Sequence, residues 1–236
     1  MYEFKTEPYQ HQKLAYENSW QTSAYALFME MGTGKTKVAI DTMGTLFTEG
    51  KINTALIIAP KGVYSNWVNK EIPQHLSDNV KVDLLLWQPN QTQKFKKRLT
   101  EVARGTDNSV LRILVMNTEA LSTQKGTKVA QRFLEVNPDN FVVVDESTSI
   151  KNRNAQRTKN IIKLGKVSKF KRILTGSPIT KNPMDLYAQC EFLGSSLLGF
   201  ESYYAFQGRY AVVQQRKFGA RSFQQITGYR NLEELN

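Results

Sequence analysis

The stretch Met29-Glu30-Met31-Gly32-Thr33-Gly34-Lys35-Thr36 decides the fold of this chain. It follows a short apolar run and precedes a segment with helical spacing, which is the local context of a phosphate-binding loop. The Walker A pattern has glycine at its first position, where this sequence has Met29, so the match departs from the pattern there. A glycine turn that caps a helix is the plainer alternative, and the context favours the phosphate loop.

The residue types in this stretch have the chemistry that ATP binding requires. The two glycines allow backbone N–H groups to approach phosphate oxygens. Lys35 supplies a cation for the β- and γ-phosphates, and the Thr36 hydroxyl is a ligand for Mg²⁺. We therefore expect the ATP-binding loop to consist of Met31, Gly32, Thr33, Gly34, Lys35 and Thr36.

On either side of this loop, short apolar runs alternate with helical patterns, which indicates an α/β fold with a parallel central sheet flanked by helices. The expected strands are 24–29, 54–59, 80–86, 113–116, 141–144 and 172–174. The expected helices are 35–47, 63–75, 93–104, 127–136, 156–164 and 184–193, with Pro73 as the weakest point.

The pattern changes near residue 194, where an aromatic stretch replaces the strand and helix alternation. We expect one main domain over residues 1–194 and an extension over 195–236. The extension is predicted to contain a helix and then a β-hairpin, with strands near 212–217 and 221–227 around Gly219.

A pair of acidic residues is the second element of the predicted nucleotide site. The apolar run Phe141-Val142-Val143-Val144 ends in Asp145-Glu146, and open α/β sheets place ligand-binding groups at the ends of their strands. Asp145 is expected to hold Mg²⁺ directly or through water. Glu146 is then free to orient and activate the water that attacks ATP. Alone, an acidic pair after a strand is commonly a helix cap, and the phosphate loop is what gives it a catalytic interpretation.

Composition favours a polyanionic partner. The 236 residues include 32 Lys and Arg against 21 Asp and Glu, a net charge of +11, and nucleic acid is the natural candidate. A basic surface that only aids solubility is the alternative. The single cysteine, Cys190, fits a reducing compartment, and no apolar run is long enough to span a bilayer. We expect a cytoplasmic protein without a membrane partner, with the nucleus as the second location.

Four motifs in order give the chain a family resemblance. It resembles the N-terminal half of helicase superfamily two, in its Swi/Snf-like branch, which has a RecA-like P-loop lobe. The matching segments are Met31–Thr36 (motif I), Ile58–Pro60 with Trp67 and Glu71 (motif Ia), Asp145–Ser147 with Ile150–Asn152 (motif II), and Thr175–Pro178 with Asn182 (motif III). Ser147-Thr148 departs from the family's Asp-Glu-Ala-His, and this variant together with the compact size suggests a viral or phage member.

The resemblance implies roles for further residues. Gln12, in Pro8-Tyr9-Gln10-His11-Gln12, resembles the glutamine that reads the adenine edge, with Gln10 as the competing residue. Thr175, Gly176 and Ser177 would couple the nucleotide site to the nucleic acid. Phosphate contacts are expected from Pro60, Lys61, Asn117, Lys151 and Arg153. Basic and aromatic residues interleaved in the extension are a second candidate for nucleic-acid binding: Arg209, Tyr210, Arg216, Lys217, Phe218, Arg221, Phe223, Tyr229 and Arg230. Packing of these aromatic side chains in a core is the equal alternative.

The resemblance also implies what this chain does and what it lacks. It predicts the ATP-binding lobe of a DNA-dependent ATPase, a translocase or helicase-like motor that uses ATP and Mg²⁺ to move on double-stranded DNA, with RNA as the alternative track. Such motors take arginine fingers from a second RecA-like lobe, so this lobe alone should turn over ATP very slowly and should need that lobe as a partner. A module that binds nucleotide and nucleic acid without cycling is the competing hypothesis.

Overall fold

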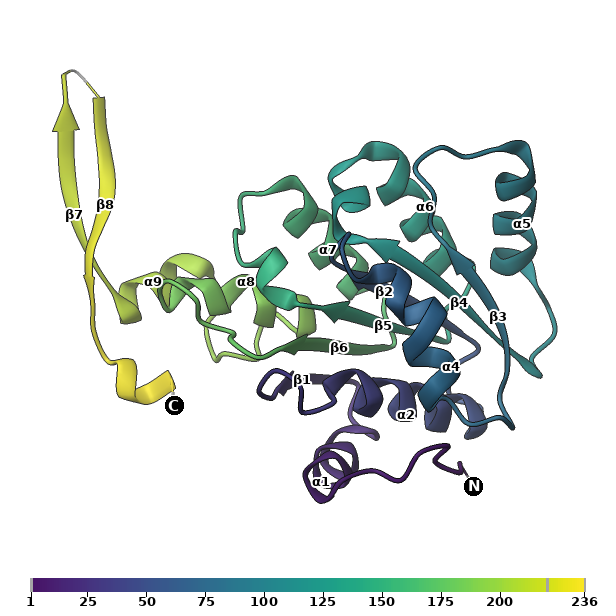
Figure 1. The fold of residues 1–236 in the computed structure, drawn as a ribbon. Coiled ribbons are helices and arrows are strands. Elements are labelled where there is room, and N and C mark those ends of the chain that lie inside the picture. Colours follow the sequence, from purple (N-terminus) through teal and green to yellow (C-terminus); the bar gives the residue numbers. More distant parts are fainter. Residues whose placement is uncertain (1, 220, 236) are drawn as a thin grey trace.

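A computed structural model describes residues 2–219 and 221–235, and for Phe218 and Arg221 it describes the backbone alone. The centre is a six-stranded parallel sheet in the order β1-β6-β5-β2-β4-β3 (Figure 1). Its strands are β1 (Ala24–Phe28), β2 (Thr54–Ala59), β3 (Lys81–Leu86), β4 (Val110–Asn117), β5 (Asn140–Asp145) and β6 (Phe170–Thr175). The inner strands are nearly continuous apolar runs because both faces of a parallel sheet are covered. The predicted α/β fold is confirmed.

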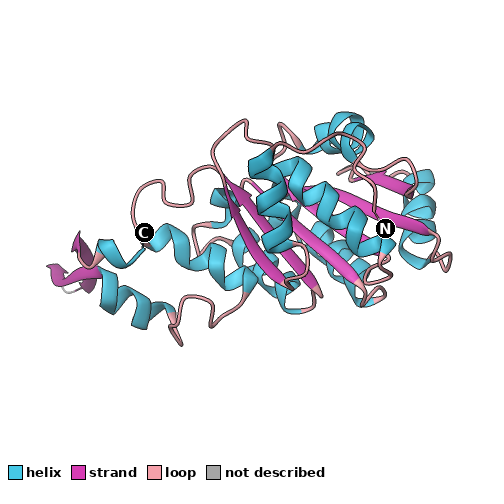
Figure 2. Cartoon of the chain, turned by 90° about the horizontal axis from the view of Figure 1, so that it is seen from below, coloured by secondary structure: helices cyan, strands magenta, loops and turns pink. Residues whose placement is uncertain are grey.

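Helices cover both faces of the sheet (Figure 2). Alternate side chains of β2 point to opposite faces of the sheet. Leu56 and Ile58 belong to one core cluster, whereas Ala55 and Ile57 belong to the other. The first cluster is closed by α5 (Gln93–Arg104), α6 (Gln124–Glu135), α7 (Gln156–Lys166) and α8 (Met184–Leu193). The second is closed by α1 (Gln10–Ser19), α2 (Lys35–Thr48), α3 (Tyr64–Asn66), the π-helical turn η1 (Trp67–Glu71) and α4 (Ile72–His75).

The differences from the predicted elements have local causes. We predicted that β4 begins at Ile113 and that β6 begins at Arg172, because the charged residues Arg112 and Lys171 precede the apolar runs. Both strands begin earlier, at Val110 and Phe170, since the parallel pairing of β4 with β3 and of β6 with β1 includes Arg112 and Lys171. Arg172 is fully buried and donates to the backbone oxygens of Ser19 and Thr22.

The predicted helix over 63–75 is present, but its middle is a π-helical turn that ends just before Pro73. Proline has no N–H group, so a carbonyl of the preceding turn loses its α-helical donor, and a wider turn accommodates the change. Three short 3₁₀ turns follow strands or close the chain: η2 (Thr118–Ser122), η3 (Ser147–Ile150) and η4 (Leu232–Leu235).

The extension contains the predicted helix and hairpin. Helix α9 (Tyr203–Tyr210) leads into β7 (Ala211–Phe218), which pairs antiparallel with β8 (Arg221–Tyr229). Phe206, Tyr210 and Ala211 form a small apolar core with Met184 and Tyr187 of α8. The hairpin therefore has a fixed base on the main domain, and its two strands project from that base as an arm (Figure 1). Within 2–219 and 221–235, no helix is long and apolar enough to cross a membrane.

The packing of α7 on α8 gives a stability test. A Cβ atom at Gly165 would lie 2.5 Å from the Phe192 carbonyl oxygen, so Gly165→Ala should lower the free energy of unfolding by about 1–3 kcal/mol despite alanine's better helix propensity. Gly208 in α9 has no atom within 4 Å of such a Cβ. Gly208→Ala should be neutral or stabilising by up to about 1 kcal/mol. Urea denaturation measures both, and equal effects of the two substitutions would contradict the packing account.

Candidate nucleotide-binding site

The sheet order brings the predicted nucleotide residues to one place. Strands β1, β6 and β5 are adjacent, with Phe28 beside Thr175 and Asp145 beside Leu174. Because the strands are parallel, the glycine loop after β1, Thr175 at the end of β6 and Asp145 at the end of β5 all lie at the carboxyl edge. Pro60 and Asn117 lie further along the same edge, after β2 and at the end of β4.

The glycine loop has the backbone that its sequence requires. Gly32 and Gly34 have φ values of 77° and 84°, in the left-handed region that favours glycine, and α2 begins at Lys35. The buried Lys35 ammonium donates to the carbonyl oxygens of Met29 and Glu30 at 2.9 and 2.8 Å. These bonds hold the lysine across the loop at the N-terminus of a helix, where anions are stabilised.

A cavity of about 490 Å³ unites the loop with the acidic pair. Lys35, Thr36, Asp145 and Glu146 all line it, as the sequence predicted. Residues from the segment after β2 form the opposite wall: Val63, Asn66, Trp67, Lys70, Glu71 and His75. Of these, Trp67 and Glu71 were singled out from the sequence. Asn66, Lys70 and His75 were not predicted from the sequence, because they are polar residues of a helical segment that belong to no recognised motif.

Asp145 is held by specific donors. Its Oδ2 accepts from the indole N–H of the buried Trp67 at 2.9 Å, and its Oδ1 accepts from the Glu146 backbone N–H at 3.0 Å. Burial raises the pKa of the Asp145 carboxyl and the Glu146 charge raises it further, while the Trp67 hydrogen bond opposes both. A carboxylate in such a place gains most from a nearby cation.

Glu146 has a strained backbone. Its φ and ψ are 48° and 62°, a left-handed conformation that is uncommon for residues other than glycine. Such strain costs about 1–3 kcal/mol and is found mainly where function requires it. The turn directs the chain into η3 immediately after β5, so that Asp145 and Glu146 both line the cavity.

The N-terminal segment meets the loop through Gln12. Its side-chain amide donates to the Thr33 carbonyl oxygen at 2.9 Å and accepts from the Tyr9 backbone N–H at 3.0 Å. A Cβ atom at Gly34 would lie 2.3 Å from this amide nitrogen, so glycine is needed for the contact as well as for its φ value. Gln12 is buried and Gln10 is exposed, which favours Gln12 among the two candidates.

A residue that the sequence reading missed joins motifs II and III. Gln189, fully buried in α8, accepts from the Ser147 hydroxyl at 2.6 Å and donates to the Pro178 carbonyl oxygen at 2.7 Å. Thr175 is also buried and accepts from the Ser177 backbone N–H at 3.2 Å. A glutamine within an otherwise apolar helical stretch was the available sign. Gln189 therefore connects the turn after the acidic pair to Pro178, the residue that follows the predicted coupling segment.

Comparison with known proteins identifies the family. Residues 9–229 match the SNF2-related domain. This chain belongs to that family. The DNA annealing helicase and endonuclease ZRANB3 of Bos taurus is 29% identical over 212 residues, which cover 88% of this chain and 17% of that protein. The DNA repair and recombination protein RAD54B of Gallus gallus is 26% identical over 213 residues, covering 87% and 21%. This SNF2-related domain thus spans about a fifth of these relatives.

Solved structures share the fold. The Sulfolobus solfataricus SWI2/SNF2 ATPase core in complex with dsDNA matches with a TM-score of 0.67 and 22% identity, over 89% of this chain and 40% of that chain. The UvsW helicase of bacteriophage T4 matches with a TM-score of 0.55 and 15% identity, over 80% and 58%. The expected N-terminal RecA-like lobe of the Swi/Snf type is confirmed. The viral origin suggested by the sequence stays a prediction.

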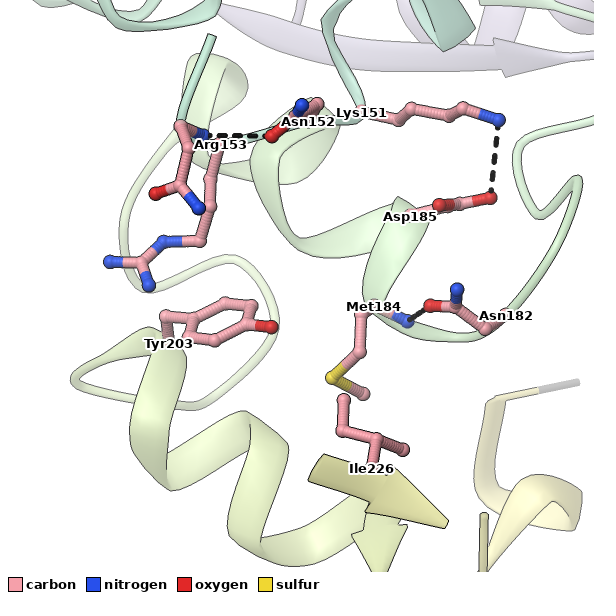
Figure 3. Close-up of a pocket in the computed structure, with 9 residues that line it drawn as sticks. Lys151, Asn152, Arg153, Asn182, Met184, Asp185, Tyr203 and Ile226 are labelled. Carbon is pink, nitrogen blue, oxygen red and sulfur yellow. Dashed lines mark hydrogen bonds and ion pairs between the residues drawn. The ribbon is translucent and has the colours of Figure 1, made fainter. Parts of the chain in front are cut away.

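The predicted nucleic-acid residues of the SNF2-related domain fall into two groups. Pro60, the exposed Lys61 and Asn117 follow adjacent strands at the carboxyl edge. Lys151 and Arg153 lie instead around a second cavity of about 340 Å³, beside α8, α9 and the hairpin (Figure 3). The Lys151 ammonium contacts the Thr180 hydroxyl and lies 3.6 Å from Oδ2 of Asp185. The guanidinium carbon of Arg153 lies 4.0 Å from the centre of the Tyr203 ring.

A buried charge pair braces the helix that carries Thr36. The side chains of Lys37 and Asp41 are 5% and 2% exposed and lie 2.7 Å apart. Tyr2 also donates to Asp41, and its ring contacts the face of Gly44. Burial raises the pKa of Asp41, and the bond from Lys37 opposes that change. Tyr2 therefore packs on α2 and stabilises the helix through Asp41 and Gly44.

Removing one member of this pair should be costly. Asp41→Asn leaves the Lys37 ammonium buried without a carboxylate, and we expect a loss of about 3–5 kcal/mol in the free energy of unfolding. Asp139→Asn, which removes the exposed carboxylate paired with Lys169, should cost less than about 1 kcal/mol. Urea denaturation compares them. Adding Lys37→Met to Asp41→Asn should recover part of the loss, and a purely additive double variant would refute the pairing.

Proposed function

We propose that this SNF2-related domain is the ATP-binding N-terminal lobe of a DNA-dependent motor, which hydrolyses ATP with Mg²⁺ to move on duplex DNA. The observation that carries the proposal is the cavity in which the phosphate loop and both carboxylates meet. A phosphate cradle alone is common to many nucleotide-binding proteins, whereas a carboxylate in reach of the same cavity supplies the group that hydrolysis needs.

The oxygen donors in the cavity fit Mg²⁺. Thr36 contributes a hydroxyl and Asp145 a carboxylate, and both line the same cavity. Mg²⁺ prefers hard oxygen ligands and takes few of them from protein, keeping water and phosphate oxygens for the rest. In the described residues no cluster of three or more His, Cys, Asp or Glu side chains offers an alternative metal site. Bound with ATP, Mg²⁺ would neutralise charge on the β- and γ-phosphate oxygens.

Each residue around the cavity would then have a separate role in ATP hydrolysis. Lys35 and the loop N–H groups bind the phosphates, and Gln12 contacts the adenine edge. Glu146 orients a water molecule toward the γ-phosphate and accepts its proton. Ser147, through Gln189 and Pro178, transmits the state of this turn to the motif III loop. Thr175, Gly176 and Ser177 in that loop would couple hydrolysis to movement on DNA.

Charge and family support duplex DNA as the partner. The chain has a net charge of +11, and the Sulfolobus relative was solved in complex with dsDNA. Contacts from Pro60, Lys61, Asn117, Lys151 and Arg153 to phosphates would not depend on base sequence, which suits a motor. A second RecA-like lobe would supply arginine fingers, and without them the rate should be lower by about 10³–10⁵.

The ATPase rate with and without duplex DNA tests the proposal. The chain alone should bind ATP and hydrolyse it very slowly. Joined to a second RecA-like lobe, it should show DNA-stimulated hydrolysis that Glu146→Gln abolishes while ATP affinity persists, because the amide keeps the shape but cannot accept the proton. ATP binding with no hydrolysis in either form would instead identify a binding module without catalytic cycling.

Nucleotide selectivity tests the role of Gln12. Gln12→Ala should raise the Kd for ATP by about fivefold, since a lost amide hydrogen bond is worth about 1 kcal/mol. The Kd for GTP should change less, and this comparison separates adenine reading from a general disturbance of the loop. Gln10→Ala serves as the matched control with no effect on either nucleotide. Equal losses for ATP and GTP would assign Gln12 to holding the loop alone.

A further inference from the structure

Among the described residues, no other strand pairs with the hairpin β7–β8, and the charged side chains of the hairpin are all basic. From Ala211 to Arg230 the sequence has Arg216, Lys217, Arg221 and Arg230 and no aspartate or glutamate. Arg216 and Lys217 are exposed, and neither has an ion-pair partner among the described residues. Four glutamines add polar groups that both donate and accept: Gln214, Gln215, Gln224 and Gln225. This composition is complementary to a polyanion.

The strand register divides these residues between two faces. Val213 pairs with Ile226, Gln215 with Gln224, and Lys217 with Ser222, and side chains two residues apart share a face. These three pairs therefore lie along one side of the hairpin. A hydrogen bond of 2.6 Å from Gln215 to Ser222, a diagonal neighbour, agrees with that register. Arg216 and Phe223 pair on the opposite face, where Phe223 is 49% exposed.

The first of these faces continues into the cavity beside the loop after motif II. Ile226 lines that cavity together with Lys151, Asn152 and Arg153 (Figure 3). Arg153 stacks on Tyr203 and lies 5.3 Å from the Tyr204 ring, so this loop is tied to α9. The Arg230 backbone N–H donates to the Tyr210 carbonyl oxygen and closes the hairpin base. This face thus runs from the basic motif II loop past the apolar pair Val213 and Ile226 to the polar pairs Gln215–Gln224 and Lys217–Ser222 further up the arm.

We propose that the hairpin β7–β8 lies in a groove of duplex DNA and forms a second contact, separate from the strand-end loops. The major groove is about 12 Å wide and admits a two-stranded β-ribbon. Strands of eight and nine residues are long enough to follow it for about 25 Å. Arg216 and Lys217 contact phosphates, and the glutamine amides contact base edges or backbone oxygens. This inference rests on duplex DNA being the substrate, as in the proposed function.

A charge-neutralising variant tests the contact. Arg216→Gln with Lys217→Gln should raise the Kd for a short fluorescein-labelled duplex by about tenfold and reduce the salt slope of log K by about 2. Lys94→Gln with Lys97→Gln removes the same charge from the exposed side of α5 and serves as the matched control, with little change expected. The whole chain is used, and fluorescence anisotropy is measured over a series of salt concentrations.

The outcomes separate this inference from the proposed function. If the unmodified chain binds no duplex DNA, the proposed function fails together with the inference. If it binds, and both double variants weaken binding equally, the hairpin contact is refuted and the proposed function survives. A loss confined to single-stranded DNA would overturn the groove assignment. ATP affinity should stay unchanged in both variants, because neither pair of residues lines the nucleotide cavity.

A crosslinking experiment is a second, independent test of the contact between the hairpin and duplex DNA. Cys190 is buried, so a cysteine introduced on the surface can be labelled selectively with a photoreactive group. Labelled Lys217→Cys should crosslink to duplex DNA, whereas labelled Lys97→Cys should not. Crosslinks from position 97 alone, or from neither position when the duplex is bound, would refute the hairpin contact.

Discussion

The structure depends on one constraint, the parallel pairing of β1, β6 and β5. Parallel neighbours bring their carboxyl ends to a common edge, so segments more than a hundred residues apart in sequence meet there: the glycine loop, Asp145 and Thr175. Burial of both faces fixes the order, because each strand must offer apolar side chains to helices on either side. This adjacency brings the glycine loop and the acidic pair to one cavity, and Trp67 and Gln12 from other elements hold them there.

Much of this was predictable from the sequence, because periodicity and glycine placement are local properties. The six strands, the glycine loop before α2 and the position of Asp145 and Glu146 at the end of β5 were predicted, and the hairpin was found from two runs around Gly219. The first residues of β4 and β6 were missed, since a charged residue suggests solvent exposure in a sequence, whereas Arg112 and Lys171 lie within paired strands. Helix α1 was not among the predicted helices, because its apolar residues form no clear stripe.

Long-range hydrogen bonds could not be predicted. Trp67 donates to Asp145 across 78 residues of sequence, and Ser147 meets Gln189 across 42. Nothing in the local sequence says which buried donor faces which acceptor, because that depends on how helices pack on the sheet. The division of the predicted nucleic-acid residues into two groups has the same origin. Lys151 and Arg153 follow β5 in sequence, yet they face α8 and α9 and leave the strand edge to Pro60, Lys61 and Asn117.

The left-handed backbone of Glu146 has an evolutionary consequence. Asparagine, aspartate and glycine tolerate this conformation, whereas valine or isoleucine would have to reorganise the turn into η3. The set of residues that drift can sample here is therefore narrow. Asparagine, aspartate or glycine could therefore replace Glu146 while the domain keeps its fold and the shape of this cavity, whereas a β-branched residue could not.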